Sequence, residues 1–184
     1  MPDLHGYALV VVDVQQGFDD PWWGRRNNPV CDENIEALVR SWTRNGRPVV
    51  LVQHDSLNPG SPLHPDAPGH ALKPYLQEVT PTLRVSKTVN SSFHGDPDLD
   101  SWLRDTGVAG IVVCGITTNH CCETTARVGG NLGHDVLYAL DATHTFDRRA
   151  PDGELVTADE LARITAVNLH GEFATVVTTA QLLS

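Results

Sequence analysis

A cysteine stands where an apolar, strand-like run turns into a helix-like segment. Cys121 ends the stretch Gly115-Ile-Thr-Thr-Asn-His-Cys, which follows the apolar run 110–114 and precedes the helix-like segment 122–127. A thiol at this position lies at the positive end of the helix dipole, which favours the nucleophilic thiolate. Most free cysteines are buried packing residues, but the turn predicts that Cys121 is a nucleophile.

Two other strand-like runs end in charged side chains that a nucleophilic thiol would use. The apolar run 7–12 is followed by Asp13, and the run 83–87 ends at Lys87. Taken alone, Asp13 could cap a loop and Lys87 could be a solvated surface charge. In a parallel sheet, however, the carboxyl ends of the strands line one crevice. We therefore expect Asp13, Lys87 and Cys121 to converge as a catalytic group.

Taken together and in this order, the motifs resemble those of the isochorismatase-like superfamily of cysteine hydrolases. This group includes nicotinamidases, N-carbamoylsarcosine amidohydrolase and streptothricin hydrolase. The matching segments are Asp13-Val14-Gln15, Lys87 followed by Ser91-Ser92-Phe93, the turn 115–121, and Asp141-Ala142-Thr143. Each segment alone is a weak signal, whereas the ordered set is a strong one. A narrower resemblance, to streptothricin hydrolases, rests on residues 117–122 and 141–146.

The resemblance implies a mechanism of amide hydrolysis. Cys121 would attack the carbonyl of a small-molecule amide or lactam, a streptothricin-type lactam in its narrowest form, and form a thioester. Asp13 would act as general base and acid, with Lys87 lowering its proton affinity. The oxyanion would be bound by the backbone N–H groups of Thr117 and Cys121. The resemblance also implies a cis peptide bond between Ile116 and Thr117.

Aromatic and histidine side chains near these strand ends are candidates for a substrate pocket. For each of them an ordinary packing role is a comparable alternative. The candidate substrate-binding residues are Phe18, Trp23, His54, Phe93 and His120, with His144 behind them.

No metal or cofactor is expected. Nicotinamidases carry an Asp-x-His type metal site after the second strand, whereas this chain reads Gln53-His54-Asp55 there. Abundant histidines do not replace converging ligands. The missing motif also weakens nicotinamide as a substrate, and the nucleophilic Cys121 argues against the vinyl ether reaction of true isochorismatases.

A catalytically silent family member is the alternative to an enzyme. Such a protein would bind a partner, or sense oxidants through the adjacent thiols of Cys121 and Cys122. The complete set of Asp13, Lys87 and Cys121 speaks against that alternative.

The elements that must position these residues alternate between strand-like and helix-like patterns. Such alternation predicts one α/β domain over residues 1–184, with a doubly wound, mostly parallel six-stranded sheet and helices on both faces. The expected strands are 7–12, 48–52, 83–85, 110–114, 136–140 and 174–177. The expected helices are 34–44, 98–105, 122–132 and 158–170, the last with a capping box from Thr157 to Glu160.

Composition narrows the partners of the chain. The net charge of −10 over 184 residues argues against nucleic acid and anionic membranes. Four cysteines without metal-finger spacing suit a reducing compartment, and the N-terminus lacks signal-peptide features, so we expect a cytoplasmic protein. The family resemblance implies a homo-oligomer, with Trp22, Trp23 and the loop Ser56 to Pro74 as candidate contact surfaces.

Overall fold

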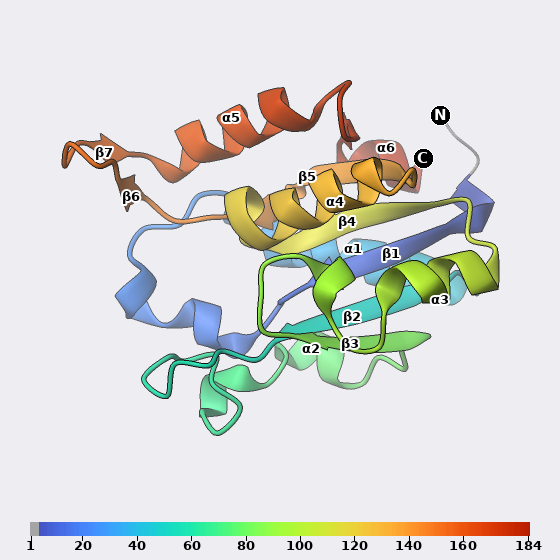
Figure 1. Cartoon of the computed structure of the whole chain (residues 1–184), viewed down its shortest axis with the longest axis horizontal. Coiled ribbons are helices and arrows are strands. Elements are labelled where there is room, and N and C mark those ends of the chain that lie inside the picture. The colour runs from blue at the N-terminus through green and yellow to red at the C-terminus, as the bar shows by residue number, and fades with distance from the viewer. Residues whose placement is uncertain (1–3) are drawn as a thin grey trace.

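The structure, a computed structural model, describes residues 4–184 and is built around one parallel sheet of six strands (Figure 1). The strands are β1 (Tyr7–Val12), β2 (Val49–His54), β3 (Leu83–Lys87), β4 (Gly110–Ile116), β5 (Asp135–His144) and β8 (Thr175–Val177). Their order across the sheet is β3-β2-β1-β4-β5-β8, so the chain starts in the middle and winds outwards in both directions. The predicted doubly wound α/β fold is confirmed.

Helices cover both faces of this sheet (Figure 1). They are α1 (Cys31–Arg44), α2 (Pro74–Gln77), α3 (Leu99–Thr106), α4 (Glu123–Asn131), α5 (Ala158–Leu169) and α6 (Thr179–Leu183). Buried side chains of α1 and α6 share one core cluster, and those of α3, α4 and α5 share the other. Between residues 4 and 184, no helix is long and apolar enough to cross a membrane.

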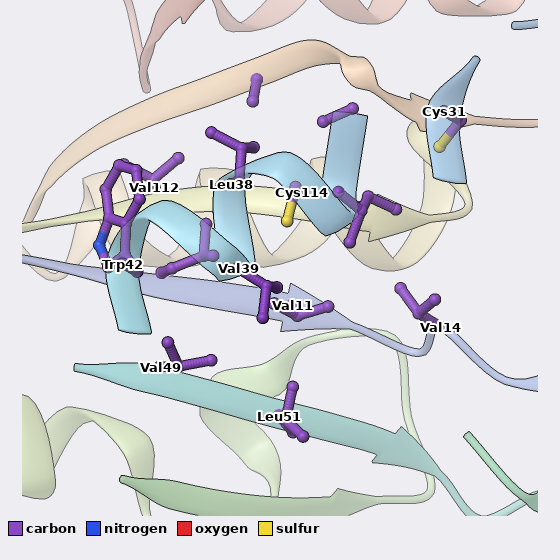
Figure 2. Close-up of a cluster of buried hydrophobic side chains, with 14 of the residues drawn as sticks. Val11, Val14, Cys31, Leu38, Val39, Trp42, Val49, Leu51, Val112 and Cys114 are labelled. Atoms are coloured by element: carbon purple, nitrogen blue, oxygen red, sulfur yellow. The ribbon is translucent and has the colours of Figure 1, made fainter. Parts of the chain in front are cut away.

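The core beneath α1 explains why β1 is apolar at every position. Leu9 and Val11 belong to the cluster with α1, whereas Val10 belongs to the cluster on the opposite face. A strand covered on both faces reads as a continuous apolar run rather than as an alternating one. Figure 2 shows Trp42 of α1 beside this sheet face, where its indole N–H donates to the carbonyl of Tyr7 at 2.9 Å. Cys114 packs in the same cluster.

Several elements differ from the sequence prediction. Strand β5 runs on to His144 because the register of the β4–β5 pair shifts between Val113 and Gly115. A short antiparallel hairpin of β6 (Arg148–Arg149) and β7 (Leu155–Val156) follows, and α6 begins with a capping box at Thr178. The predicted capping box of Thr157 and Glu160 is present at the start of α5.

The central strands β1 and β4 form the point at which the winding direction reverses, and they approach each other closely at their carboxyl ends. A Cβ atom on Gly115 would lie 2.1 Å from the carbonyl oxygen of Val12, and the φ angle of Gly115 is +124°. Only glycine accepts this contact and this conformation without strain. In a doubly wound sheet, the crevice at such a reversal is where ligands bind.

Candidate active site

Asp13 is the first residue after β1, and its backbone turns sharply there. Its φ angle is +51°, a left-handed conformation that is uncommon for residues other than glycine and is found most often at functional sites. The turn is held by two backbone hydrogen bonds: the Asp13 N–H donates to Val52 at 3.0 Å, and the Gln15 N–H donates to Asp13 at 2.8 Å. The carboxylate is thereby directed into the protein, and the residue is fully buried.

Lys87, the last residue of β3, forms an ion pair with Asp13. Its Nζ lies 2.6 Å from Oδ2 of Asp13, and neither side chain is exposed to solvent. Burial lowers the pKa of Lys87, but the charge and hydrogen bond of Asp13 together with the contribution of Cys121 outweigh it, so that the pKa lies above its ordinary value. Lys87 is therefore a fixed cation, and one oxygen of Asp13 is committed to it.

The second oxygen of Asp13 is uncommitted. Oδ1 is buried and has no hydrogen-bond partner. Buried polar atoms are nearly always paired, so an unpaired buried carboxylate oxygen is a candidate for receiving a proton or a ligand. The use of this oxygen as a proton acceptor stays a prediction.

Cys121 lies in a π-helical turn, Thr118–Cys122, that joins β4 to α4. The hydroxyl of Thr118 donates to the hydroxyl of Thr143 at 2.9 Å, and the hydroxyl of Tyr138 donates to the carbonyl of Thr118 at 2.8 Å. These bonds tie the turn to β5. Such single-turn π segments are frequent at functional sites. Only 8 % of Cys121 is exposed.

Burial favours the protonated thiol of Cys121 over the thiolate, against the predicted effect of the helix dipole. Burial raises the pKa of Cys121 well above its ordinary value, the charge of Asp13 raises it further, and the charge of Lys87 lowers it. Loss of hydration outweighs the helix dipole because the dipole is worth only about 1 kcal/mol. A nucleophilic Cys121 therefore needs a base, and Asp13 is near enough to act on the thiol.

Asn90 is a neighbour of the thiol that the sequence prediction missed. Its Oδ1 lies 3.6 Å from Sγ of Cys121, within reach of a hydrogen bond from the thiol, and the residue is exposed to solvent. The following segment is fixed, since Ser91 caps a short 3-10 helix and the N–H of Ser92 donates to Thr125 of α4 at 3.0 Å. The two serines of the Lys87 to Phe93 motif thus position Asn90 beside the thiol of Cys121.

The peptide bond between Ile116 and Thr117 is cis. The carbonyl of Thr117 accepts hydrogen bonds from the N–H groups of His120 at 3.3 Å and Cys122 at 3.2 Å. These bonds orient the backbone that leads to Cys121. The use of the Thr117 and Cys121 N–H groups as oxyanion donors stays a prediction.

His54 ends β2, the strand between those that carry Asp13 and Lys87. Its Nδ1 lies 3.5 Å from Nζ of Lys87, and burial together with that cation lowers the pKa of His54, which keeps the ring neutral. Gln15 holds this histidine in place: its side chain accepts the N–H of His54 at 2.9 Å and donates to the His54 carbonyl at 3.1 Å. The Gln15 of the Asp13-Val14-Gln15 motif is thus a positioning residue.

The three aromatic residues predicted for the pocket, Phe18, Trp23 and Phe93, lie in two separate groups. Phe18 and Trp23 form an aromatic cluster with ring centroids 5.0 Å apart, and Trp23 also stacks on Phe146, which follows β5. Phe93 is buried, and its ring stacks on His134 at 5.5 Å. This contact gives Phe93 a packing role, and its predicted pocket role stays a prediction.

His120 and His144 are the other two histidines predicted near the pocket, and burial lowers the pKa of each. His120 is half-buried, and burial and the charge of Arg148 lower its pKa. His144 is fully buried behind Phe146, with both ring nitrogens unpaired, and burial lowers its pKa to about 3. His144 is therefore a core residue, whereas His120 lies next to Cys121 in the turn Thr118–Cys122.

The residues after β2 do not fit a metal ion. Asp55 is bonded to Nε2 of His70 at 2.7 Å, and His54 faces the cationic Lys87, which would repel a divalent ion. In the described part of the chain, no group of three or more His, Cys, Asp or Glu side chains could hold a metal.

Comparison with known proteins agrees with this geometry, because residues 7–181 match the Isochorismatase domain family. The chain belongs to the isochorismatase family. It is 40 % identical over 177 residues to the uncharacterized isochorismatase family protein YrdC of Bacillus subtilis, covering 96 % of this chain and 94 % of that protein. An isochorismatase-family crystal structure from Chromobacterium violaceum superposes with a TM-score of 0.93 at 35 % identity, covering 100 % and 94 % of the two chains.

A relative with a named substrate is also found. The streptothricin hydrolase of Streptomyces noursei is 33 % identical over 149 residues, covering 79 % of this chain and 57 % of that protein. The relatives of this chain thus include a protein named as a hydrolase of streptothricin. In this family member a buried thiol, an unpaired carboxylate oxygen and a buried cation lie together at the carboxyl ends of the strands, and such a set can transfer a proton and form a covalent bond.

Proposed function

We propose that this isochorismatase-family protein is a cysteine-dependent amidohydrolase that cleaves an amide or lactam C–N bond of a small molecule. One observation carries the proposal: Asp13 gives one oxygen to Lys87 and leaves the other buried and unpaired beside a protonated thiol. A carboxylate held in this way can accept the thiol proton and later release it.

In the first half of the reaction, Sγ of Cys121 attacks the substrate carbonyl while the thiol proton passes to Oδ1 of Asp13. The C–N bond then breaks, Asp13 returns the proton to the leaving nitrogen, and a thioester on Cys121 remains. The negative charge on the carbonyl oxygen is received by the backbone N–H groups of Thr117 and Cys121. Loss of one such donor typically costs about 3 kcal/mol of transition-state stabilisation.

In the second half, water hydrolyses the thioester. Asp13 takes a proton from the attacking water, the C–S bond breaks, and the proton passes to the departing sulfur. Lys87 keeps its charge throughout, because its pKa is raised by Asp13. The ammonium of Lys87 stays beside Asp13 in both halves of the reaction, and the same oxygen of Asp13 acts twice.

The proposed substrate is a small molecule. In its narrowest form, the proposal names a lactam of the streptothricin type. The similarity to streptothricin hydrolase supports this class. Nicotinamide is less well supported, because Asp55 and His54 are engaged elsewhere and do not form a metal site.

A redox-sensing role is less well supported than hydrolysis, because the adjacent thiols of Cys121 and Cys122 are both buried. Cys122 is completely buried, and burial raises its pKa well above the ordinary value. Sensor cysteines are accessible and have a low pKa.

The proposal is tested by mass spectrometry of the purified protein with nicotinamide, N-carbamoyl compounds, maleamate, ureidoacrylate and streptothricin. We expect one amide to gain one water, with the activity lost in Cys121→Ala and retained in the matched control Cys31→Ala, whose thiol lies in the core. Equal turnover by the wild type and Cys121→Ala would refute the cysteine mechanism. Failure of the whole panel, with no adduct on Cys121, would refute the amidohydrolase.

A further inference from the structure

A groove of about 530 Å³ lies between the short 3-10 helix Pro21–Trp23 and the loop that follows β2. Its walls include Asp20, Trp22, Trp23, Ser56, Pro59 and Pro62. We call it the tryptophan groove. The catalytic steps proposed above do not use it.

Two tryptophans form the aromatic wall of the tryptophan groove, of which Trp23 is held by its neighbours and Trp22 is exposed to solvent. Trp23 is fixed, since its ring stacks on Phe146 at 5.4 Å and its indole N–H donates to the carbonyl of Gly17 at 2.8 Å. Trp22 contacts Trp23 edge to face, with ring centroids 4.8 Å apart, and is 74 % exposed. An indole this exposed offers its face to a ligand.

The charge of the groove has one sign. Asp20 is the single ionisable side chain among the groove's lining residues, all of which the structure describes, and no lysine or arginine lines it. One of its oxygens, Oδ1, accepts the backbone N–H of Trp22 at 2.8 Å, which holds the carboxylate next to the indoles. A carboxylate beside indole faces is the chemistry that binds organic cations, because the ring faces and the carboxylate both attract positive charge.

The groove lies at the same edge of the sheet as the candidate active site. Asp20 and Trp23 belong to the segment that follows β1, and Ser56 is two residues beyond His54, whose ring lies beside Lys87. Figure 1 shows both segments beyond the carboxyl ends of β1 and β2.

We propose that the tryptophan groove binds an alkylated ammonium group that the substrate carries at a distance from its scissile amide. That this ammonium group belongs to the substrate rests on the proposed function. The binding of an ammonium group to the groove does not. The indoles and prolines accommodate methyl or methylene groups, and Asp20 balances the charge. The chain's net charge of −10 adds long-range attraction for a cation.

The test is a titration of the full-length protein with choline, followed by the indole N–H resonances of the tryptophans in two-dimensional NMR. The neutral isostere 3,3-dimethylbutan-1-ol is titrated in parallel, and the buried Trp42 serves as an internal control. We expect choline to shift Trp22 and Trp23 saturably and Trp42 not at all. The isostere should bind roughly tenfold more weakly, as expected for loss of a cation–π contact and an ion pair.

Three variants make the test specific. Asp20→Asn should weaken choline binding roughly tenfold and Trp22→Leu should abolish the Trp23 shift, whereas Asp66→Asn, an exposed carboxylate nearby on the same loop, should change nothing. Cys121→Ala should bind choline like the wild type, so binding and hydrolysis can fail separately. Equal shifts with the alcohol, no shift with either probe, or full binding by Asp20→Asn would overturn the proposal. Resonances that depend on protein concentration and not on choline would assign the groove to a second copy instead.

Discussion

Nζ of Lys87 and Oδ2 of Asp13 lie 2.6 Å apart, and both side chains are completely excluded from water. The two residues are 74 positions apart in the chain and lie at the carboxyl ends of two strands that are separated by β2. Taking two charges out of water costs several kcal/mol per ion, which a close pair offsets only in part. Such a pair is poor evidence for stability, and its place beside Cys121 indicates that it serves the chemistry.

Breaking this pair should destabilise the fold. Lys87→Met leaves a buried, uncompensated carboxylate, which typically lowers the free energy of unfolding by about 3 to 5 kcal/mol. The double variant Asp13→Leu with Lys87→Met should lose much less than the sum of the two single changes. Urea denaturation of the three variants at pH 7 measures this coupling, and strictly additive losses would contradict it.

The pH dependence of that stabilisation has a defined sign. The folded-state pKa of Lys87 is raised above 10.5, so the contribution of the ammonium is complete below that pH and disappears only in more alkaline solution. Stability curves of the wild type and Lys87→Met should therefore differ by a constant amount between pH 7 and 9.

The reactivity of Cys121 should respond in opposite directions to the two charges. The charge of Asp13 raises the pKa of the thiol and that of Lys87 lowers it. Asp13→Asn should therefore shift the pH profile of iodoacetamide alkylation to lower pH, and Lys87→Met should shift it to higher pH. Peptide mass spectrometry reads the rate at Cys121, and shifts of the same sign in both variants would be incompatible with the assigned charges.

Amide hydrolysis by Asp13→Asn should nevertheless fall. Removing a general base typically slows a reaction about 10² to 10⁴-fold. A variant whose thiol ionises more readily but whose turnover is lost would show that Asp13 carries protons rather than merely setting the charge of the thiol.

Asn90 should tune the thiol from the solvent side. Asn90→Asp would place a negative charge beside Sγ of Cys121, which is 3.6 Å from the present Oδ1, and should shift the alkylation profile to higher pH. Asn90→Ala removes only a neutral contact and should leave the profile nearly unchanged. The control is Asn58→Asp, at an exposed position beyond β2. An unchanged profile in Asn90→Asp would remove this residue from the site.

His144 should make the protein sensitive to acid. Its folded-state pKa is about 3 against an ordinary value of 6.5, mainly because burial disfavours the charged ring. The unfolded chain therefore binds one more proton between these values, and stability falls by about 1.4 kcal/mol per pH unit as the pH drops through that range. His144→Leu should unfold at a lower pH than the wild type, as followed by circular dichroism, whereas an unchanged midpoint would show that His144 is protonated in the native state.

Much of the fold could be predicted because both faces of the central strands are covered. The six residues of β1 are buried without exception, so the apolar run in the sequence and the strand have the same bounds. The hairpin of β6 and β7 could not be predicted, since two-residue strands carry no periodic signal. The extension of β5 to His144 depends on a register shift that only pairing with β4 produces.

The site could be predicted in part, for similar reasons. Asp13 and Lys87 stand at strand ends, where the topology of a parallel sheet brings charges together. Asn90 and Gln15 are amides in loops, and nothing in their spacing indicates that one contacts the thiol and the other holds His54. The protonated state of Cys121 is set by burial, which the position of a residue at a strand-to-helix turn does not reveal.

The proposed mechanism passes through a thioester on Cys121. The most direct measurement is turnover of the amide found in the substrate panel in the presence of hydroxylamine, with the products and the intact protein analysed by mass spectrometry. We expect hydroxamate to form in competition with the free acid, and acid-quenched protein to carry the acyl mass on Cys121. Hydrolysis that yields only the free acid at all hydroxylamine concentrations, with no acyl group on the protein, would show that water attacks the amide directly and would refute the thioester mechanism.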